Sequence, residues 1–390
     1  MPSDSEVSTD PRAPRAQAGP GGFNMDNPLA ASADITSYLA KFVDDNQFLF
    51  FVSVSKQWRE AWGHQRPTVT AAVTADTSVS QLSCSIDCGL RGTAALCSAI
   101  AKLGKLDLLQ YAEECGFAWD KKTCSSAAKG GHLGVLQWAR SKSCPWDEST
   151  CQWAAKAGHL GVIQWARSNG CPWDEGTCNY AAEAGHLGVL EWARSNGCPW
   201  SERTCRFAAL GGRLDTLQWA RANGCPWNMM TCSDAAMFGH LAVIQWARSN
   251  GCPWDGRTCG NAAVGGHLGI LQWARSNSCP WDASTCSSAA MAGHLDILQW
   301  ARSNGCPWDS WTCANAAGLG HLRILQWVRS NGCPWNETTC FCAAGGGHFD
   351  ILRWARSNGC PWESSTIRAA ERNGHYHIVA WAILNGCPYT

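Results

Sequence analysis

Hydrophobic positions recur along most of the chain with a period of 27 residues, and each period contains two patterns typical of amphipathic helices. In the copy from Asp174 to Trp200, Cys178 and the pair Ala181–Ala182 fall at i, i+3 and i+4, which places small apolar side chains on one helix face. Residues 187–193 carry a second, wider apolar face at the same spacing. Each period therefore predicts a pair of helices, which becomes stable when it stacks on its neighbours.

Turn residues predict where these helices begin and end. The first residue of the unit belongs to the polar types that cap helix N-termini, as at Asp147, Ser201 and Asn228. Gly185 ends the first helix, and Asn196–Gly197 ends the second with a glycine suited to a left-handed C-cap. We therefore expect residues 92–390 to form a solenoid of about eleven helix pairs.

The repeated pattern TCxxAAxxGHLxVLxWxxxNGC resembles an ankyrin repeat. Ala181–Ala182 match the double alanine of that family, and Gly185–His186 match the pair between its helices. The resemblance implies a solenoid that binds proteins on its concave side. The period is shorter than the family's roughly 33 residues, and the missing residues fall where the family has a β-hairpin finger. The predicted fold is therefore an all-α, ankyrin-like helix-pair solenoid without long β-hairpin fingers.

The N-terminal part has a different character. Residues 1–28 are rich in Pro, Gly, Ser and Ala, which predicts a disordered tail. Residues 29–63 contain short apolar helical runs that end in Val-Ser-Lys-Gln-Trp-Arg, and this segment resembles an F-box without the usual opening Leu-Pro. Residues 64–91 are a predicted connector. The residues that the resemblance assigns to contact with an adaptor are Ile35, Leu39, Phe42, Phe48, Val54 and Trp58.

The F-box resemblance implies docking on a Skp-type adaptor of a cullin ubiquitin ligase, with the solenoid holding the target as a substrate receptor. The alternative is that the segment only caps the first repeat, because solenoids need polar end caps for solubility. The sequence leaves both open.

Composition narrows the functional classes. The formal net charge is zero and 16% of residues are charged, which predicts no binding of nucleic acid. No apolar run approaches the ~18 residues of a membrane helix, and the N-terminus has no secretory apolar core. These features predict no membrane association and a monomeric protein of the cytoplasm or nucleus. An effector secreted by another route, binding host proteins, is an alternative.

The cysteines raise the question of metal or redox chemistry. Of the 24 cysteines, 20 stand in two columns spaced by 27 residues. Equivalent residues of adjacent helices lie ~8–10 Å apart, beyond the ~7 Å Cα limit of a disulfide. Buried free cysteine also behaves as a small hydrophobe. We therefore predict core packing without metal or cofactor, and keep a thiol-based metal or redox protein as the alternative. No catalytic constellation is present, which predicts a non-enzymatic protein.

Comparison of the units with one another separates fixed from variable positions. The variable pairs follow the first cysteine and precede the glycine, so they form one face of the first helix, opposite the Cys-Ala-Ala stripe. Three aromatic residues share one column there; they either form an exposed strip ~20 Å long or pack against the next helix. The predicted partner-binding residues are Gln152, Trp153, Lys156, Tyr180, Glu183, Arg206, Phe207, Met229, Met230 and Phe238. The expected function is a protein-interaction scaffold.

Overall fold

The computed structural model describes residues 73–87, 90 and 92–389, and the chain falls into two compact units, Met1–Trp119 and Asp120–Thr390. All regular elements of the described part are α-helices, so the all-α solenoid without β-hairpin fingers is confirmed there. None of these helices has the length and apolar character that a membrane span requires.

The first unit contains three described helices. They are α4 (Val79–Asp87), α5 (Ala94–Lys102) and α6 (Leu106–Glu114). The α5–α6 pair is the first copy of the repeat, and the Tyr111 hydroxyl of α6 lies 2.9 Å from the Ser83 hydroxyl of α4. The F-box-like segment 29–63 and its six predicted adaptor-binding residues lie outside the described residues, so the domain boundaries proposed there stay predictions.

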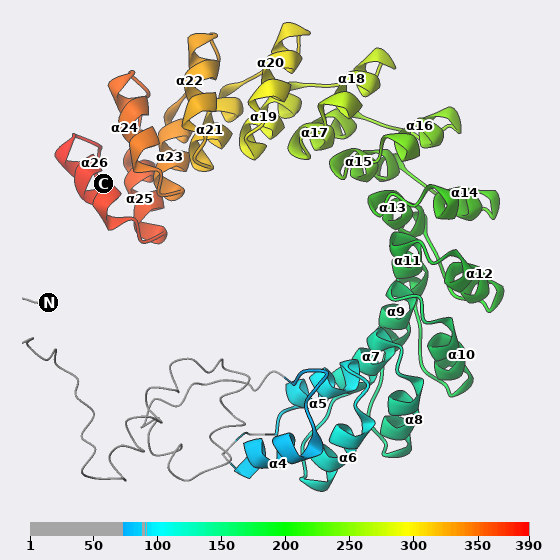
Figure 1. The fold of residues 1–390 in the computed structure, drawn as a ribbon. Helices are drawn as coiled ribbons and strands as arrows, with labels where there is room; N and C mark the ends of the chain where they lie inside the picture. The colour runs from blue at the N-terminus through cyan, green and yellow to red at the C-terminus, as the bar shows by residue number, and fades with distance from the viewer. Residues whose placement is uncertain (1–72, 88–89, 91, 390) are drawn as a thin grey trace, which may run out of the picture. The chain divides into compact units, whose positions relative to one another are not determined.

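The second unit is built from two rows of helices (Figure 1). The inner row comprises α7 (Lys121–Gly130), α9 (Glu148–Lys156), α11 (Glu175–Ala184), α13 (Glu202–Leu210), α15 (Met229–Met237), α17 (Gly256–Val264), α19 (Ala283–Ala292), α21 (Ser310–Gly318), α23 (Glu337–Gly345) and α25 (Ser364–Arg372). The outer row comprises α8 (Leu133–Ser141), α10 (Leu160–Ser168), α12 (Leu187–Ser195), α14 (Leu214–Ala222), α16 (Leu241–Ser249), α18 (Leu268–Ser276), α20 (Leu295–Ser303), α22 (Leu322–Ser330), α24 (Phe349–Ser357) and α26 (Tyr376–Leu384). Each inner helix packs on the next inner helix and on its own outer helix.

Helix ends lie where the capping residues predict them. The Asp174 carboxylate accepts the backbone N–H of Gly176 at 3.0 Å and starts α11. Ser201 and Asn228 cap α13 and α15 in the same way. Gly185 follows α11 with φ +81°, a left-handed conformation that glycine adopts without strain. Local hydrogen bonds thus fix the ends of the helices in each unit, and the same bonds recur in the other units every 27 residues.

The core is a continuous stack of small side chains. Cys178, Ala181 and Ala182 of α11 are fully buried, and so is Leu190 of α12. The second cysteine of this unit, Cys198, is also buried, and its thiol donates to the Asp174 carbonyl at 3.3 Å. The loop after the outer helix is thereby tied to the start of the inner helix, which closes each unit upon itself.

A ladder of arginine and tryptophan joins successive outer helices. The guanidinium of Arg194 lies 4.0 Å from the ring centroid of Trp200 and donates to the Cys198 carbonyl. Trp200 in turn meets Trp219 of the next unit edge to face at 6.0 Å. The same cation–π contact recurs from Arg140 to Arg356. Because each such contact contributes about 0.5–1 kcal/mol at exposed sites, the arginine column is explained by packing without an anionic ligand.

Candidate protein-binding surface

Three aromatic side chains form a continuous strip over three inner helices. Trp153 of α9 and Tyr180 of α11 stack with centroids 6.2 Å apart and ring planes 8° apart. Tyr180 meets Phe207 of α13 edge to face at 5.9 Å. All three side chains are only partly buried. The strip therefore combines both readings of the sequence, since the rings pack against one another and part of each ring still faces solvent.

Lysine side chains flank this strip. The Lys129 ammonium lies 4.1 Å from the Trp153 centroid, and the Lys156 ammonium lies 5.1 Å from the Tyr180 centroid. Lys156 also contacts both carboxylate oxygens of Glu183 at 3.0 Å. Residues of the units before and after Trp153 thus contact its ring, while Lys156 and Glu183 neutralise each other.

Several predicted partner-binding residues bind within the chain. The Gln152 amide donates to the N-cap carboxylate of Asp174 at 2.8 Å. Arg206 forms an ion pair with Asp234, whose side chain is almost buried. Each contact joins one unit to the next. Part of the sequence variation between units therefore comes from pairs of residues that form hydrogen bonds or ion pairs between consecutive units.

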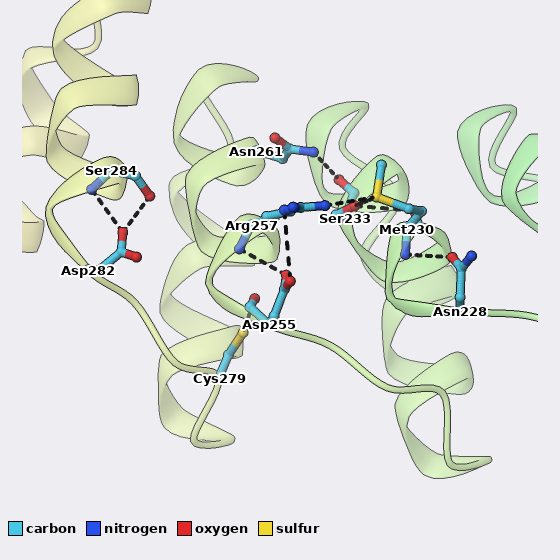
Figure 2. A network of polar contacts seen from close by, with 9 residues as sticks. All are labelled: Asn228, Met230, Ser233, Asp255, Arg257, Asn261, Cys279, Asp282 and Ser284. Atoms are coloured by element: carbon cyan, nitrogen blue, oxygen red, sulfur yellow. Dashed lines mark hydrogen bonds and ion pairs between the residues drawn. The ribbon is translucent and has the colours of Figure 1, made fainter.

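The remaining predicted residues lie on α15 and just after it. Met229 and Phe238 are exposed at opposite ends of the helix. The Met230 sulfur lies 3.8 Å from the Ser233 hydroxyl and 3.9 Å from the Arg257 guanidinium, within the network of Figure 2. Met229 and Phe238 are therefore open to a partner, and Met230 is partly used by the fold.

The structure also shows exposed apolar residues that the set of predicted partner-binding residues left out. Met237, Met291 and Leu319 are exposed near the C-terminal ends of inner helices, and Trp311 is exposed in the first turn of α21. A column-by-column comparison would have found Met237 and Met291, because their position in the unit is apolar in the four successive copies Leu210, Met237, Val264 and Met291. Leu319 stands one position later in its unit and would not have been found in this way.

The cysteine columns pack in the core. Cys205 and Cys225 are fully buried, and the Cys205 sulfur lies 3.9 Å from the Cys225 carbonyl oxygen. The hydrogen bond with the Cys225 thiol, followed by burial, holds the pKa of Cys205 well above its usual range. Within the described ranges, no group of three His, Cys, Asp or Glu residues is arranged to hold a metal ion.

The histidine column supports the helix ends. His240 Nε2 donates to the Leu210 carbonyl of the preceding unit at 3.0 Å. In the unit where arginine replaces histidine, Arg213 Nε donates to the Glu183 carbonyl at 3.2 Å. Arginine can stand in for histidine at this position because both donate to the end of the preceding inner helix.

No family model and no curated protein matches this chain. Among solved structures, the human ASB11 ankyrin repeat domain is similar at 17% identity and TM-score 0.34, over 40% of this chain and 84% of that one. The pentatricopeptide repeat protein PPR10 in complex with an 18-nt psaJ RNA element is similar at 14% identity and TM-score 0.37, over 92% of this chain and 58% of that one. At these TM-scores neither likeness bears on what this chain binds.

Proposed function

We propose that this chain is a non-enzymatic scaffold that binds a protein partner on the inner side of an ankyrin-like solenoid. The observation that carries the proposal is the strip of Trp153, Tyr180 and Phe207, three partly exposed aromatic rings in contact across consecutive units. Aromatic side chains dominate the hot spots of protein interfaces. The strip is already ordered by its own ring contacts, so binding orders few side chains anew.

The ring arrangement favours a protein over a nucleic acid. Single-stranded nucleic acids bind by stacking bases on open aromatic faces. Lys129 and Tyr180 approach Trp153 from the units on either side, so a base that stacked on this ring would compete with side chains already in contact with it. The zero formal net charge also gives the chain no overall excess of basic residues, and basic residues supply most of the affinity for phosphates.

The test compares affinity capture by the full chain with capture by the triple variant Trp153→Ala, Tyr180→Ala, Phe207→Ala. Trp311→Ala, which removes an exposed tryptophan elsewhere, is the matched control. We expect a partner that is retained by the wild type and the control and lost by the triple variant, and calorimetry with the purified partner then gives its affinity. A partner set that is identical for all three proteins would refute the aromatic strip as the binding site.

We further infer that the F-box-like segment docks on a Skp-type adaptor in a reducing cytoplasmic or nuclear compartment, making the scaffold a substrate receptor of a ubiquitin ligase. This inference is supported by the motif that ends in Trp58-Arg59. Calorimetry of the full chain with a purified adaptor tests it, with Val54→Ala, Trp58→Ala as the variant. The absence of binding by the wild type would leave the segment as a candidate end cap.

A further inference from the structure

The helix α26, at the C-terminal end of the outer row in Figure 1, carries apolar side chains on its solvent-facing side. Tyr376, Ala380, Ile383 and Leu384 are spaced as i, i+4, i+7 and i+8, so they share one helix face, here called the outer stripe. The exposed fractions are 71% for Tyr376, 45% for Ile383 and 85% for Leu384, and Ala380 is also exposed. The outer stripe is therefore open to solvent along the whole helix.

The opposite side of α26 is used by the fold. Ile378 and Ala382 are fully buried there, where α26 packs on α25. Trp381 meets Phe349 of α24 edge to face at 5.4 Å. The outer stripe thus adds a second apolar face to a helix that already packs on α24 and α25. Because a helix that is apolar all round is normally buried all round, we expect another surface to cover the stripe.

The repeat itself does not require these apolar side chains. The residues that α20 has at the positions of Ala380, Ile383 and Leu384 are Gln299, Arg302 and Ser303. All outer helices from α8 to α24 carry Gln, Glu or Arg at the first of these positions and Arg at the second. Since the same stack of helices forms with polar side chains there, packing within the chain does not explain the outer stripe.

The outer stripe offers a partner apolar contacts rather than ionic ones. The sequence of α26 contains no Asp, Glu, Lys or Arg. On the adjoining helix α24, Asp350 and Arg353 lie 3.8 Å apart as an ion pair. Arg356 of the same helix lies over the Trp362 ring, 4.2 Å from its centroid. A partner therefore gains little from charge, and two identical stripes do not repel each other.

The order of side chains along the stripe suits a twofold axis through Ala380. Tyr376 and Leu384 stand four residues before and four residues after it. When two copies of α26 pack antiparallel about this axis, Tyr376 of each copy meets Leu384 of the other. The two Ala380 side chains meet at the centre, where their small size allows the close approach of ~8 Å between helix axes. Such a contact joins identical surfaces and closes as a dimer.

The area of the outer stripe is sufficient for a reversible dimer. A large side chain buries roughly 150–250 Å² when it is fully covered, so the exposed parts of Tyr376, Ile383 and Leu384 supply roughly 600–1,000 Å² over two copies. Apolar atoms make up about 60% of protein interfaces, which gives a total of roughly 1,000–1,600 Å². Specific interfaces begin at about 1,000 Å², whereas obligate dimers bury about 2,000 Å² or more.

We propose that the outer stripe joins two copies of this chain in a reversible, antiparallel dimer through α26. Composition predicts a monomer, and the outer stripe is the observation that argues against it. The dimer goes beyond the proposed function and does not depend on it, because the stripe lies on the outer row and the aromatic strip on the inner row. Both aromatic strips of the dimer remain free for partners.

Sedimentation velocity of the full chain, in reductant and from about 1 to 300 µM, tests the dimer. The triple variant Ala380→Gln, Ile383→Arg, Leu384→Ser introduces the residues of α20, so the fold accepts them. Trp311→Ala, at a tryptophan that is 56% exposed on the inner row, is the matched control. We expect the wild type and the control to dimerise with a Kd on the order of 10–100 µM and the triple variant to bind at least about ten-fold more weakly.

Leu384→Ser alone should weaken the dimer at least about three-fold, and it changes only one exposed residue. A wild type that stays monomeric at the highest concentration would overturn the proposal. So would dimerisation that is equally strong in the wild type and the triple variant, because the contact would then lie elsewhere.

Disulfide trapping tests the twofold axis. In an Ala380→Cys variant the new thiols of two copies meet at the axis, so a mild oxidant should link them into a covalent dimer. Gln299→Cys places a thiol at the equivalent exposed position of α20 and has the same native cysteines, so it gives the background. We expect at least about ten-fold faster linkage at position 380. Equal rates in the two variants would overturn the antiparallel dimer through α26.

Discussion

Gly212 and Gly224 lie in neighbouring turns, and we expect substitution by alanine to destabilise the chain more at Gly212 than at Gly224. Gly212 has φ +71°, and a Cβ added there would lie 2.6 Å from the ring of His240. Gly224 has φ +80°, and an added Cβ would meet nothing within 4 Å. Ser143 and Ser278 already replace the second glycine in two units, with φ +61° and +64°. The first position is glycine in every copy of the unit, which agrees with the lack of space.

The magnitudes follow from these contacts. Alanine in the left-handed region costs about 1–2 kcal/mol, and this is the whole expected loss for Gly224→Ala. Gly212→Ala incurs the same strain and also displaces the His240 ring, whose Nε2 donates to the Leu210 carbonyl at 3.0 Å. The lost hydrogen bond contributes about 1 kcal/mol and the overpacking about 1–3 kcal/mol. We expect Gly212→Ala to lose at least about 2 kcal/mol more than Gly224→Ala.

Hydrogen exchange measured by mass spectrometry resolves the effect locally, which matters because long repeat arrays do not always unfold as one unit. Peptides from α13 and α14 should exchange roughly 30-fold faster in Gly212→Ala than in Gly224→Ala, since 1.4 kcal/mol corresponds to about ten-fold. Urea midpoints followed by circular dichroism give the global stability. Equal losses in the two variants would show that the histidine contact does not restrict the turn.

Three further predictions concern the thiols and the unit interfaces. Among the described cysteines, exposed Cys115 should react quickly with a disulfide reagent in the folded chain, while the buried columns react only on unfolding; rapid labelling of many thiols would contradict a closed core. The raised pKa of buried thiols such as Cys205 keeps them protonated in the folded chain, whereas thiols of the unfolded chain ionise near pH ~8.5. The free energy of unfolding should therefore fall as the pH rises above that value. A urea midpoint that is unchanged between about pH 7.5 and 9.5 would refute this. A double-mutant cycle of Gln152→Ala with Asp174→Ala should give a coupling of about 0.5–1 kcal/mol, because their side chains lie 2.8 Å apart; zero coupling would mean that this bond contributes nothing to the interface.

Helix pairs, their boundaries and their core were predictable from the sequence because they depend on local interactions. Asp174 caps α11 through a residue two positions on, and Gly185 ends the same helix by its own backbone conformation. The burial of Cys178 follows from its place in a stripe at helical spacing. Each of these features needs only a short stretch of chain, and the repeat displays it several times.

Contacts between units were not predictable in the same way. Lys156 and Glu183 occupy the same position in consecutive units and form an ion pair with each other. In a comparison of single columns, however, lysine and glutamate at one position register only as a variable position. Arg206 and Asp234, 28 residues apart, likewise form an ion pair between consecutive units. A comparison of single columns treats such residues as unconstrained, because their partner stands in another column or another unit.

Variable positions therefore contain two different kinds of residue. Some, such as Arg206 and Asp234, differ from the equivalent residues of other units because each pairs with a residue of the neighbouring unit. Leu319 has no such neighbour, since it remains 54% exposed, and the equivalent position is occupied by Ala157 and Gly211 in other units. The stack thus forms equally well without a large side chain there. Fully burying an exposed leucine contributes about 1.5–3 kcal/mol. Leu319 is 54% exposed, so roughly half of that stabilisation remains available to a surface that covers it.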